Sequence, residues 1–322
     1  MSERNVWAGI DEAGYGPLLG PLVVAGTAFR LPCSPSEGIL WELLDEAVVQ
    51  TGSSGRDRLM VNDSKEVYST SRGWRRLEEG VLSFAELAGA LPDCAGALLE
   101  RLAPAERTDG EPWFSGTDGL ELPSASNPSA VASKTRDLEM ALRTADVALE
   151  GMWACVVLPR EFNALVQKMG NKSLLLFNRA GRILRTVWSG EEDGDACVLV
   201  DRHGGRGRYR TLLRNVYPEL PCDIAAEGPE RSVYAIGDGP AGLQVAFKKD
   251  GDRLALPTAL ASMIAKYVRE LHMKAFNRYW QERAQELKPT AGYGRDAYRF
   301  LDDIDEVLRE EGVDRDRLVR CR

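Results

Sequence analysis

Histidine is scarce in this chain: only two of the 322 residues, His203 and His272, carry an imidazole. A histidine-based zinc site or a Ser/His/Asp triad has almost no material to draw on, so neither is expected. The six cysteines are scattered and form no CxxC pair, which argues against a disulfide framework. Any bound metal should therefore be a hard cation held by oxygen ligands.

Long apolar runs are missing as well, since no stretch approaches the roughly 20 residues of a membrane span. Residues 1–6 are polar and lead directly into a strand-like run, so a secretory signal is not expected. The composition, with 44% hydrophobic and 28% charged residues, is ordinary for a globular chain able to bury a large core. We expect a cytoplasmic, monomeric protein that does not contact a membrane.

Most of the chain also lacks a strong charge of either sign. The formal net charge is −8, but residues 80–150 hold 12 Asp/Glu against 5 Lys/Arg, so the other 251 residues together carry only −1. The acidity belongs to one segment, and the body of the protein remains compatible with a nucleic-acid substrate.

Continuous apolar runs rich in β-branched residues alternate with segments of helical periodicity. Strands are predicted at 6–10, 22–29, 151–158 and 196–200, with one or two more within 232–247. Helices are predicted over 160–188 with a break at Gly170, over 209–216, from Pro257 onward and over 296–311. This order predicts an α/β fold, with a mixed central β-sheet flanked by helices and a C-terminal helical part.

Residues 80–150 differ in composition from the rest of the chain, with an Ala/Leu-rich part followed by a Pro/Ser/Gly-rich stretch. We interpret them as an acidic insertion, partly helical and partly mobile, and peripheral to the catalytic core. The predicted organisation is a first part of the main domain, the insertion, the remainder of that domain and a C-terminal helical segment, over 1–79, 80–150, 151–283 and 284–322.

Adjacent carboxylates end the first predicted strand, where Asp11 and Glu12 precede a loop containing Gly14 and Gly16. For an isolated Asp-Glu pair, a solvated junction between strand and loop is the simpler interpretation. Asp201, however, ends another apolar strand in the same way. Carboxylates at the ends of neighbouring strands converge, and such an edge can build a site for divalent metal ions.

A further candidate lies on the helix that begins near Pro257. Ser262, Lys266 and Glu270 recur every four residues and therefore share one face. Taken alone, Lys266 and Glu270 are best explained as an exposed ion pair that contributes about 0.3–0.5 kcal/mol.

Five segments, in order, resemble the type 2 ribonuclease H family (ribonucleases HII and HIII). The first, GIDEAGYGPLLGPLVVAG, is similar to the family's opening motif, and NDSKEVYS resembles its D-S-K-x-x-S element. The other three are VLVDRHGGRGRYRTLLRNVYPEL, PTALASMIAKYVRE and GYGRDAYRFL, which resemble the third-carboxylate segment, the A-S-x-x-A-K-x-x-R-[DE] helix and the C-terminal G-Y-x-T motif.

The resemblance implies a ribonuclease H-like fold that cleaves the RNA strand of an RNA/DNA hybrid by a two-metal-ion mechanism. It implies that two Mg²⁺ or Mn²⁺ ions are held by the catalytic carboxylates, which are Asp11, Glu12, Asp201 and Glu270. It further implies a set of substrate-binding residues, namely Gly14, Tyr15, Gly16, Lys65, Arg206, Ser262, Lys266 and Tyr293.

Two departures from the family concern substrate choice. Tyr15 stands where the HII branch has an arginine, so cleavage of single embedded ribonucleotides is expected to be weak, and Arg295 replaces the usual threonine. Five arginines follow Asp201 without any acidic residue, and we favour a rim that contacts phosphates over a solvated face (Arg202, Arg206, Arg208, Arg210 and Arg214). Alternative functions are a catalytically weakened nucleic-acid-binding protein on the same fold and a ribonuclease H-like nuclease acting on DNA.

Overall fold

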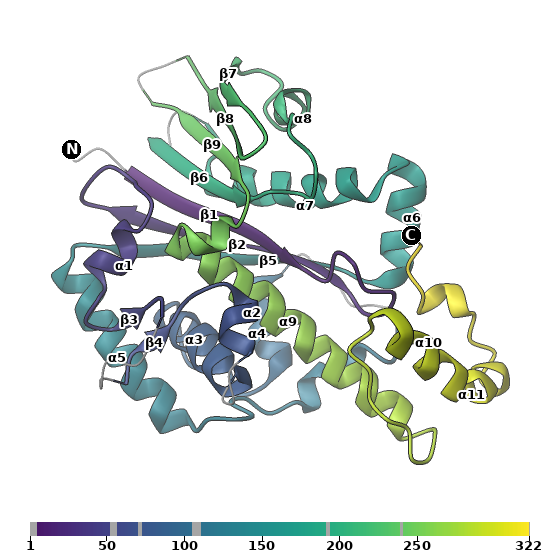
Figure 1. Ribbon diagram of the computed structural model, residues 1–322. Coiled ribbons are helices and arrows are strands. Elements are labelled where there is room, and N and C mark those ends of the chain that lie inside the picture. The colour runs from purple at the N-terminus through teal and green to yellow at the C-terminus, as the bar shows by residue number, and fades with distance from the viewer. Residues whose placement is uncertain are drawn as a thin grey trace.

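The computed structural model describes residues 5–51, 57–69, 73–104, 111–190, 194–238 and 241–321. Its centre is a seven-stranded mixed sheet (Figure 1). In spatial order the strands are β5 (Ala148–Val157), β2 (Leu22–Leu31), β1 (Asn5–Ala13), β6 (Asp195–Asp201), β9 (Leu243–Lys248), β8 (Arg231–Ile236) and β7 (Cys222–Glu227). β1, β6 and β9 run parallel, and the remaining pairs are antiparallel. The predicted α/β class with a mixed sheet is confirmed.

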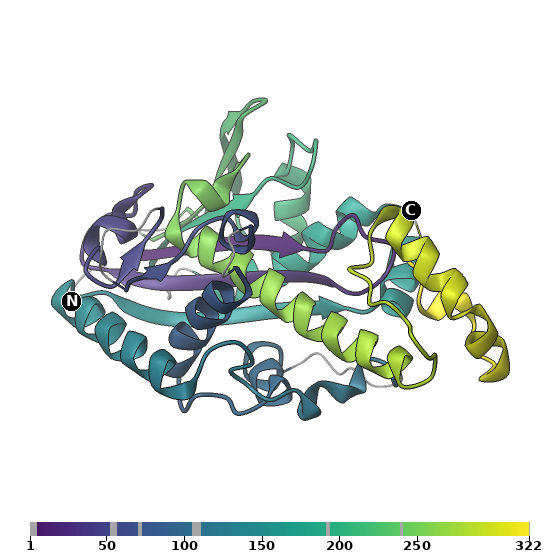
Figure 2. The same cartoon turned by 60° about the horizontal axis from the view of Figure 1, so that its bottom comes forward.

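Helices cover both faces of this sheet (Figures 1 and 2). One face carries α6 (Pro159–Met169), α7 (Lys172–Val187) and α8 (Arg210–Val216). The other carries α3 (Gly73–Leu87), α4 (Ala95–Leu102), α5 (Pro128–Thr144) and the 26-residue α9 (Leu256–Gln281). The predicted break at Gly170 is confirmed, because this glycine ends α6 with a φ of 72° and Asn171 then caps α7.

The start of α9 lies directly against β1 at a position that only glycine can occupy. A Cβ placed on Gly9 would lie 2.1 Å from the backbone nitrogen of Thr258, well inside any permissible contact. The hydroxyl of Thr27 on β2 donates to the carbonyl of Pro257 at 2.9 Å. These contacts fix α9 across β1 and β2, so residues on its first turns face the end of the sheet where β1 and β6 finish.

The segment 80–150 packs closely against the rest of the domain. Its first boundary falls inside α3 and its second inside β5. Trp113 and Phe114 are fully buried. Phe114 stacks on Phe276 of α9 at 5.7 Å between ring centroids, and Trp113 lies 5.5 Å from Trp280. These rings belong to the main hydrophobic core, so part of the segment packs into the body of the domain, and its expected place outside the catalytic core stays a prediction.

A buried carboxylate on α3 fastens the stretch 115–132, which the sequence suggested to be mobile. Glu78 is fully buried and accepts hydrogen bonds from the backbone N–H groups of Ser124, Ala125 and Ser126 at 2.7–3.0 Å. The hydroxyl of Tyr267 on α9 donates to the same carboxylate at 3.0 Å. Since each donor satisfies a charge that would be costly to bury alone, the stretch is tied to the core at this point.

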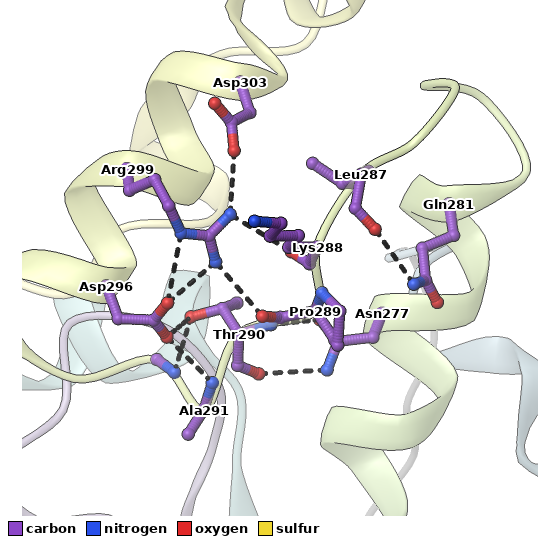
Figure 3. Close-up of polar contacts among 11 residues, drawn as sticks. Asn277, Gln281, Leu287, Lys288, Pro289, Thr290, Ala291, Asp296, Arg299 and Asp303 are labelled. Carbon is purple, nitrogen blue, oxygen red and sulfur yellow. Dashed lines mark hydrogen bonds and ion pairs between the residues drawn. The ribbon is translucent and has the colours of Figure 1, made fainter.

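Two shorter helices, α10 (Gly294–Asp303) and α11 (Asp305–Glu310), replace the single helix predicted over 296–311. Arg299 bridges Asp296 and Asp303, each at 2.7 Å, and also donates to backbone carbonyls before the helix (Figure 3). Asn277 of α9 and Thr290 exchange two hydrogen bonds of 2.9 Å. These contacts attach the C-terminal segment to the end of α9.

The smaller elements complete the description. α1 (Ile39–Leu43), the two-stranded pair β3 (Val48–Val49) and β4 (Leu59–Met60), and α2 (Ser64–Tyr68) lie between β2 and α3 in the chain. Within the described ranges, no helix has the length and hydrophobicity needed to cross a membrane.

Candidate active site

Three carboxylates converge where the parallel strands β1 and β6 end. One oxygen each of Asp11, Glu12 and Asp201 lies within 4.8 Å of the others. Asp11 and Glu12 are consecutive, and both lie past Ile10, the last β1 residue paired with β6, while they remain paired with β2. Asp201 is anchored by the backbone N–H of Gly251, which donates to its Oδ1 at 2.8 Å. The sequence-based expectation that these three meet at one sheet edge agrees with this geometry.

The electrostatics of this cluster favour the protonated forms of the carboxyl groups. Burial raises the pKa of Asp11 well above its ordinary value, and the charges of Glu12 and Asp201 add to the effect. Burial likewise raises the pKa of Glu12 to about 8, with Asp201 as the strongest repelling neighbour. The pKa of Asp201 is raised by burial, against the two backbone N–H groups that lower it. Such a group of oxygens is a good receptor for a cation.

A fourth carboxylate belongs to this neighbourhood, and the sequence analysis missed it. Asp252 is buried in the short 3-10 turn η3 (Gly251–Arg253), between β9 and α9. Its charge contributes to the raised pKa values of Asp11 and Glu12. Burial, with Asp63 and Asp201, raises its own pKa to about 7. The sequence feature that could have indicated Asp252 is its position five residues after the apolar run 243–247. That run is the strand β9, which pairs parallel to β6.

Glu270 is not part of the group of three, and neither is Asp252, which acts on that group through its charge. Among the described residues, the only group of His, Cys, Asp or Glu whose ligand atoms meet is that of Asp11, Glu12 and Asp201. Glu270 lies two helical turns beyond Ser262, about 12 Å along the axis. Its Oε1 accepts from Lys266 at 2.8 Å and from Arg269 at 3.1 Å. The ion pair that the spacing alone suggested is therefore what the structure contains.

Ser262 lies beside the carboxylates and also connects two helices. Its hydroxyl lies near enough to Asp11 to lower the pKa of that carboxyl group, and it donates to the hydroxyl of Ser64 on α2 at 3.1 Å. α2 begins at its N-cap, Asp63, whose side chain accepts from the backbone N–H of Lys65 at 2.9 Å. The ammonium of Lys65 lies close enough to lower the pKa of Glu12, opposing the effect of burial. The motif around Lys65 thus borders the carboxylates, as expected.

The loop after β1 is held in place by hydrogen bonds from Arg320, near the C-terminal end of the chain. Gly14 has a φ of 81°, and a Cβ there would lie 2.4 Å from the carbonyl of Pro21, whereas a Cβ on Gly16 would meet nothing within 4 Å. The buried guanidinium of Arg320 donates to the carbonyls of Gly14 and Tyr15, the latter at 3.0 Å. The loop is therefore rigidly supported underneath and open at Gly16.

Two further expected binding residues, Lys266 and Tyr293, differ in their contacts and exposure. Lys266 stacks over the ring of Tyr68 at 4.8 Å, in addition to its bond with Glu270. Tyr293 is 47% exposed, with the guanidinium of Arg269 5.0 Å from its ring. The structure does not place Lys266 or Tyr293 within the carboxylate group itself.

The arginine-rich segment after Asp201 covers the loop between β6 and α8 and continues into α8, which holds Arg210 and Arg214. Arg202 donates from Nε to the carbonyl of Arg206 at 2.8 Å, which closes the loop on itself. Arg208 is 92% exposed, with Nε 3.8 Å from a carboxylate oxygen of Glu227. Arg206 lines a cavity together with Tyr15, so this part of the arginine-rich segment adjoins the loop after β1.

No protein-family model and no curated protein sequence matches the chain. Several solved structures resemble it. The chain is similar to ribonucleases HII and HIII.

One of these structures is described as the complex of PCNA with ribonuclease HII from Archaeoglobus fulgidus, at 15% identity, a TM-score of 0.42, and coverage of 98% of this chain and 94% of that one. Ribonuclease H2 from Pyrococcus horikoshii has 15% identity and a TM-score of 0.42, with 97% and 92% covered. Bst ribonuclease HIII in complex with Mn²⁺ has 11% identity and a TM-score of 0.43, with 99% and 67% covered. The functional conclusion rests on the chain's own residues.

Proposed function

We propose that this protein is a metal-dependent endoribonuclease that hydrolyses the RNA strand of RNA/DNA hybrids. The observation that carries the proposal is the meeting of Asp11, Glu12 and Asp201 within 4.8 Å, directly beside a loop whose outer glycine is open. This combination offers ligands for hard cations next to backbone groups that a sugar-phosphate chain can approach closely. The resemblance of five sequence segments to type 2 ribonucleases H points to the same activity.

The carboxylate site offers oxygen donors, which are the ligands that a pair of Mg²⁺ or Mn²⁺ ions prefers. Within the described part of the chain, Oε2 of Glu12 is buried and has no hydrogen-bond partner, so one acceptor is left for a cation. Asp11, Glu12 and Asp201 would hold the metal, and Asp252 replaces Glu270 as the proposed fourth carboxylate. When bound, the ions would activate a water molecule and stabilise the charge on the leaving 3′-oxygen.

The surrounding residues have distinct proposed roles in binding the substrate. The amides of the loop Gly14–Tyr15–Gly16 would contact the ribose 2′-hydroxyl and a phosphate, because that loop allows close approach. Lys65 would place a positive charge beside the scissile phosphate without acting as a metal ligand. Ser262 would keep Asp11 oriented through its nearby hydroxyl.

The decisive experiment is a cleavage assay with Mg²⁺ or Mn²⁺ on a long hybrid, a DNA duplex with one ribonucleotide and an all-DNA duplex. We expect cleavage of the hybrid, loss of cleavage in Asp11→Asn and in Asp252→Asn, and retention in Glu270→Gln, which changes a carboxylate outside the cluster. Hybrid binding without cleavage would favour a catalytically weakened binding protein. Cleavage of all-DNA duplex would favour a nuclease acting on DNA, and both results contradict the proposal.

A further inference from the structure

An open cavity of about 680 Å³ lies beside the loop after β1, between the first turn of α7 and the loop that links β6 to α8. Its lining contains two arginines and three glycines, and none of the described residues that line it is acidic (Tyr15, Ser173, His203, Gly204, Gly205, Arg206, Gly207 and Arg208). We call it the Arg206 pocket. A cavity whose charged side chains are all cationic is suited to an anionic ligand.

Arg206 is held in place with part of its binding capacity unused. Its Nη2 donates to the hydroxyl of Ser173 at 2.7 Å, and its backbone carbonyl accepts from Arg202. Within the described part of the chain, its Nε is buried without any hydrogen-bond partner. A guanidinium fixed on one side and unsatisfied on another is prepared to bind a second acceptor, and planar oxyanions match its donor geometry.

His203 supplies a second unused polar group in the lining of the pocket. The side chain is only 3% exposed, and its ring packs edge-on against Phe177, Tyr209 and Phe247 at 5.9–6.2 Å. Among the described residues, its Nδ1 is buried and has no partner. An unsatisfied ring nitrogen in the wall of a cationic cavity is explained if an occupant or ordered solvent completes the site.

The first turn of α7 adds positive potential from the opposite side. The ammonium of Lys172 lies 4.9 Å from the centre of the Tyr15 ring, so it stands at the rim of the pocket. Ser173 is the second residue of the 16-residue α7; Asn171 caps its backbone N–H, and the helix dipole gives this end of the helix a positive potential. Positive groups from two separate elements therefore face the same space.

We propose that the Arg206 pocket binds a phosphate group of the polynucleotide backbone, as a subsite separate from the carboxylate cluster. Its openness suits a continuous chain that passes through, and Tyr15 joins it to the loop three residues after Glu12. The identity of the polynucleotide, an RNA/DNA hybrid, rests on the proposed function. Arg206 and His203 contact the phosphate, while Lys172 and Arg208 attract it from the rim.

The experiment measures equilibrium binding of the full-length protein to a short hybrid duplex at several salt concentrations, without divalent ions so that no cleavage occurs. We expect Arg206→Gln to weaken binding about ten-fold and to lower the slope of log Kd against log salt by about one. Arg136→Gln is the matched control, because it removes the same charge from an exposed position on α5, across the sheet. It should change neither quantity appreciably.

A set of duplexes, each with one neutral methylphosphonate linkage at a different position, locates the phosphate that the pocket binds. Where the linkage is in the RNA strand, the modified nucleotide is a deoxynucleotide, so that the linkage is stable. One position should weaken binding of the wild type and leave Arg206→Gln unaffected. Equal losses in Arg206→Gln and Arg136→Gln, or no position that depends on Arg206, would overturn the subsite. A protein that binds through Arg206 but never cleaves would instead overturn the proposed activity alone.

Discussion

Neutralising Glu12 should stabilise the metal-free protein, although it removes a residue of the proposed active site. Burial and the charge of Asp201 raise the pKa of Glu12 from an ordinary 4.5 to about 8. A folded-state pKa above the unfolded value means that the folded protein binds the proton more tightly. The wild type therefore loses stability as the pH rises from about 4.5 to about 8, and Glu12→Gln escapes this loss.

The size of the effect follows from the same two pKa values. Above pH 8 the full difference corresponds to at most about 5 kcal/mol, because one pKa unit is about 1.4 kcal/mol. Partial exposure of the side chain reduces this to about 2–4 kcal/mol. For a chain of this length that is a rise in Tm of roughly 3–6 °C. At pH 5 the advantage should shrink below about 1 kcal/mol.

The assay is thermal unfolding in a chelator at pH 5 and at pH 8.5, with Glu270→Gln as the matched control. The control removes a carboxylate that accepts from Lys266 and Arg269, so it should not gain stability at either pH. Added Mn²⁺ should raise the Tm of the wild type at pH 8.5 and reduce the advantage of Glu12→Gln. A Glu12→Gln protein that is no more stable than wild type at pH 8.5, or equally stabilised at both pH values, would refute the reasoning.

Three other substitutions test separate parts of the structure. Glu78→Ala should lower the free energy of unfolding by about 3–5 kcal/mol in denaturant titrations, because several buried donors lose their acceptor; a loss below 1 kcal/mol would contradict the contacts. Arg320→Met should raise KM for a hybrid more than it lowers kcat, with Arg320→Lys less affected, and a pure kcat defect would argue against support of the loop. Tyr15→Arg should improve kcat/KM on a single embedded ribonucleotide relative to a hybrid, and efficient single-ribonucleotide incision by the wild type would show that the missing charge is unimportant.

Much of the fold could be predicted because its strands are buried on both faces. β1, β2 and β6 are continuous apolar runs, and two carboxylate positions at their ends indicated the site. Gly170 marked the break between α6 and α7 because its φ is positive, which few other residues tolerate. Local composition and periodicity are enough for features of this kind.

The packing of segment 80–150 could not be predicted, because its composition resembles that of a loop. Its many acidic, Pro, Ser and Gly residues give no indication that Trp113 and Phe114 are core residues. Their rings pack against α9. The loop at 124–126 has a polar sequence, yet it is anchored by the buried Glu78. Neither contact can be read from local sequence, since the partners lie far away in the chain.

The fourth carboxylate was also difficult to predict from sequence. A residue can share a helix face with a site residue and still lie far from the site. Glu270 shares a helix face with Ser262, but two turns separate them, and its charge is satisfied by Lys266. Asp252 follows a strand whose place beside β6 depends on long-range pairing. Only the sheet order brings it to the edge where Asp201 stands, so topology decides which acidic residue lies near the cluster.

The same dependence on distant residues separates the catalytic cluster from the loop beside it. β1 and β6 position Asp11 and Asp201 through sheet pairing. The loop after β1 relies on the other end of the chain, because Gly292 accepts from the N–H groups of Leu18 and Leu19, and Arg320 donates to Gly14 and Tyr15. Damage to the C-terminal residues should therefore disturb contacts with the substrate while the carboxylates keep their arrangement. Under the proposed function, metal binding and hybrid binding would depend on two structural units, one held by the sheet and one by the C-terminal segment.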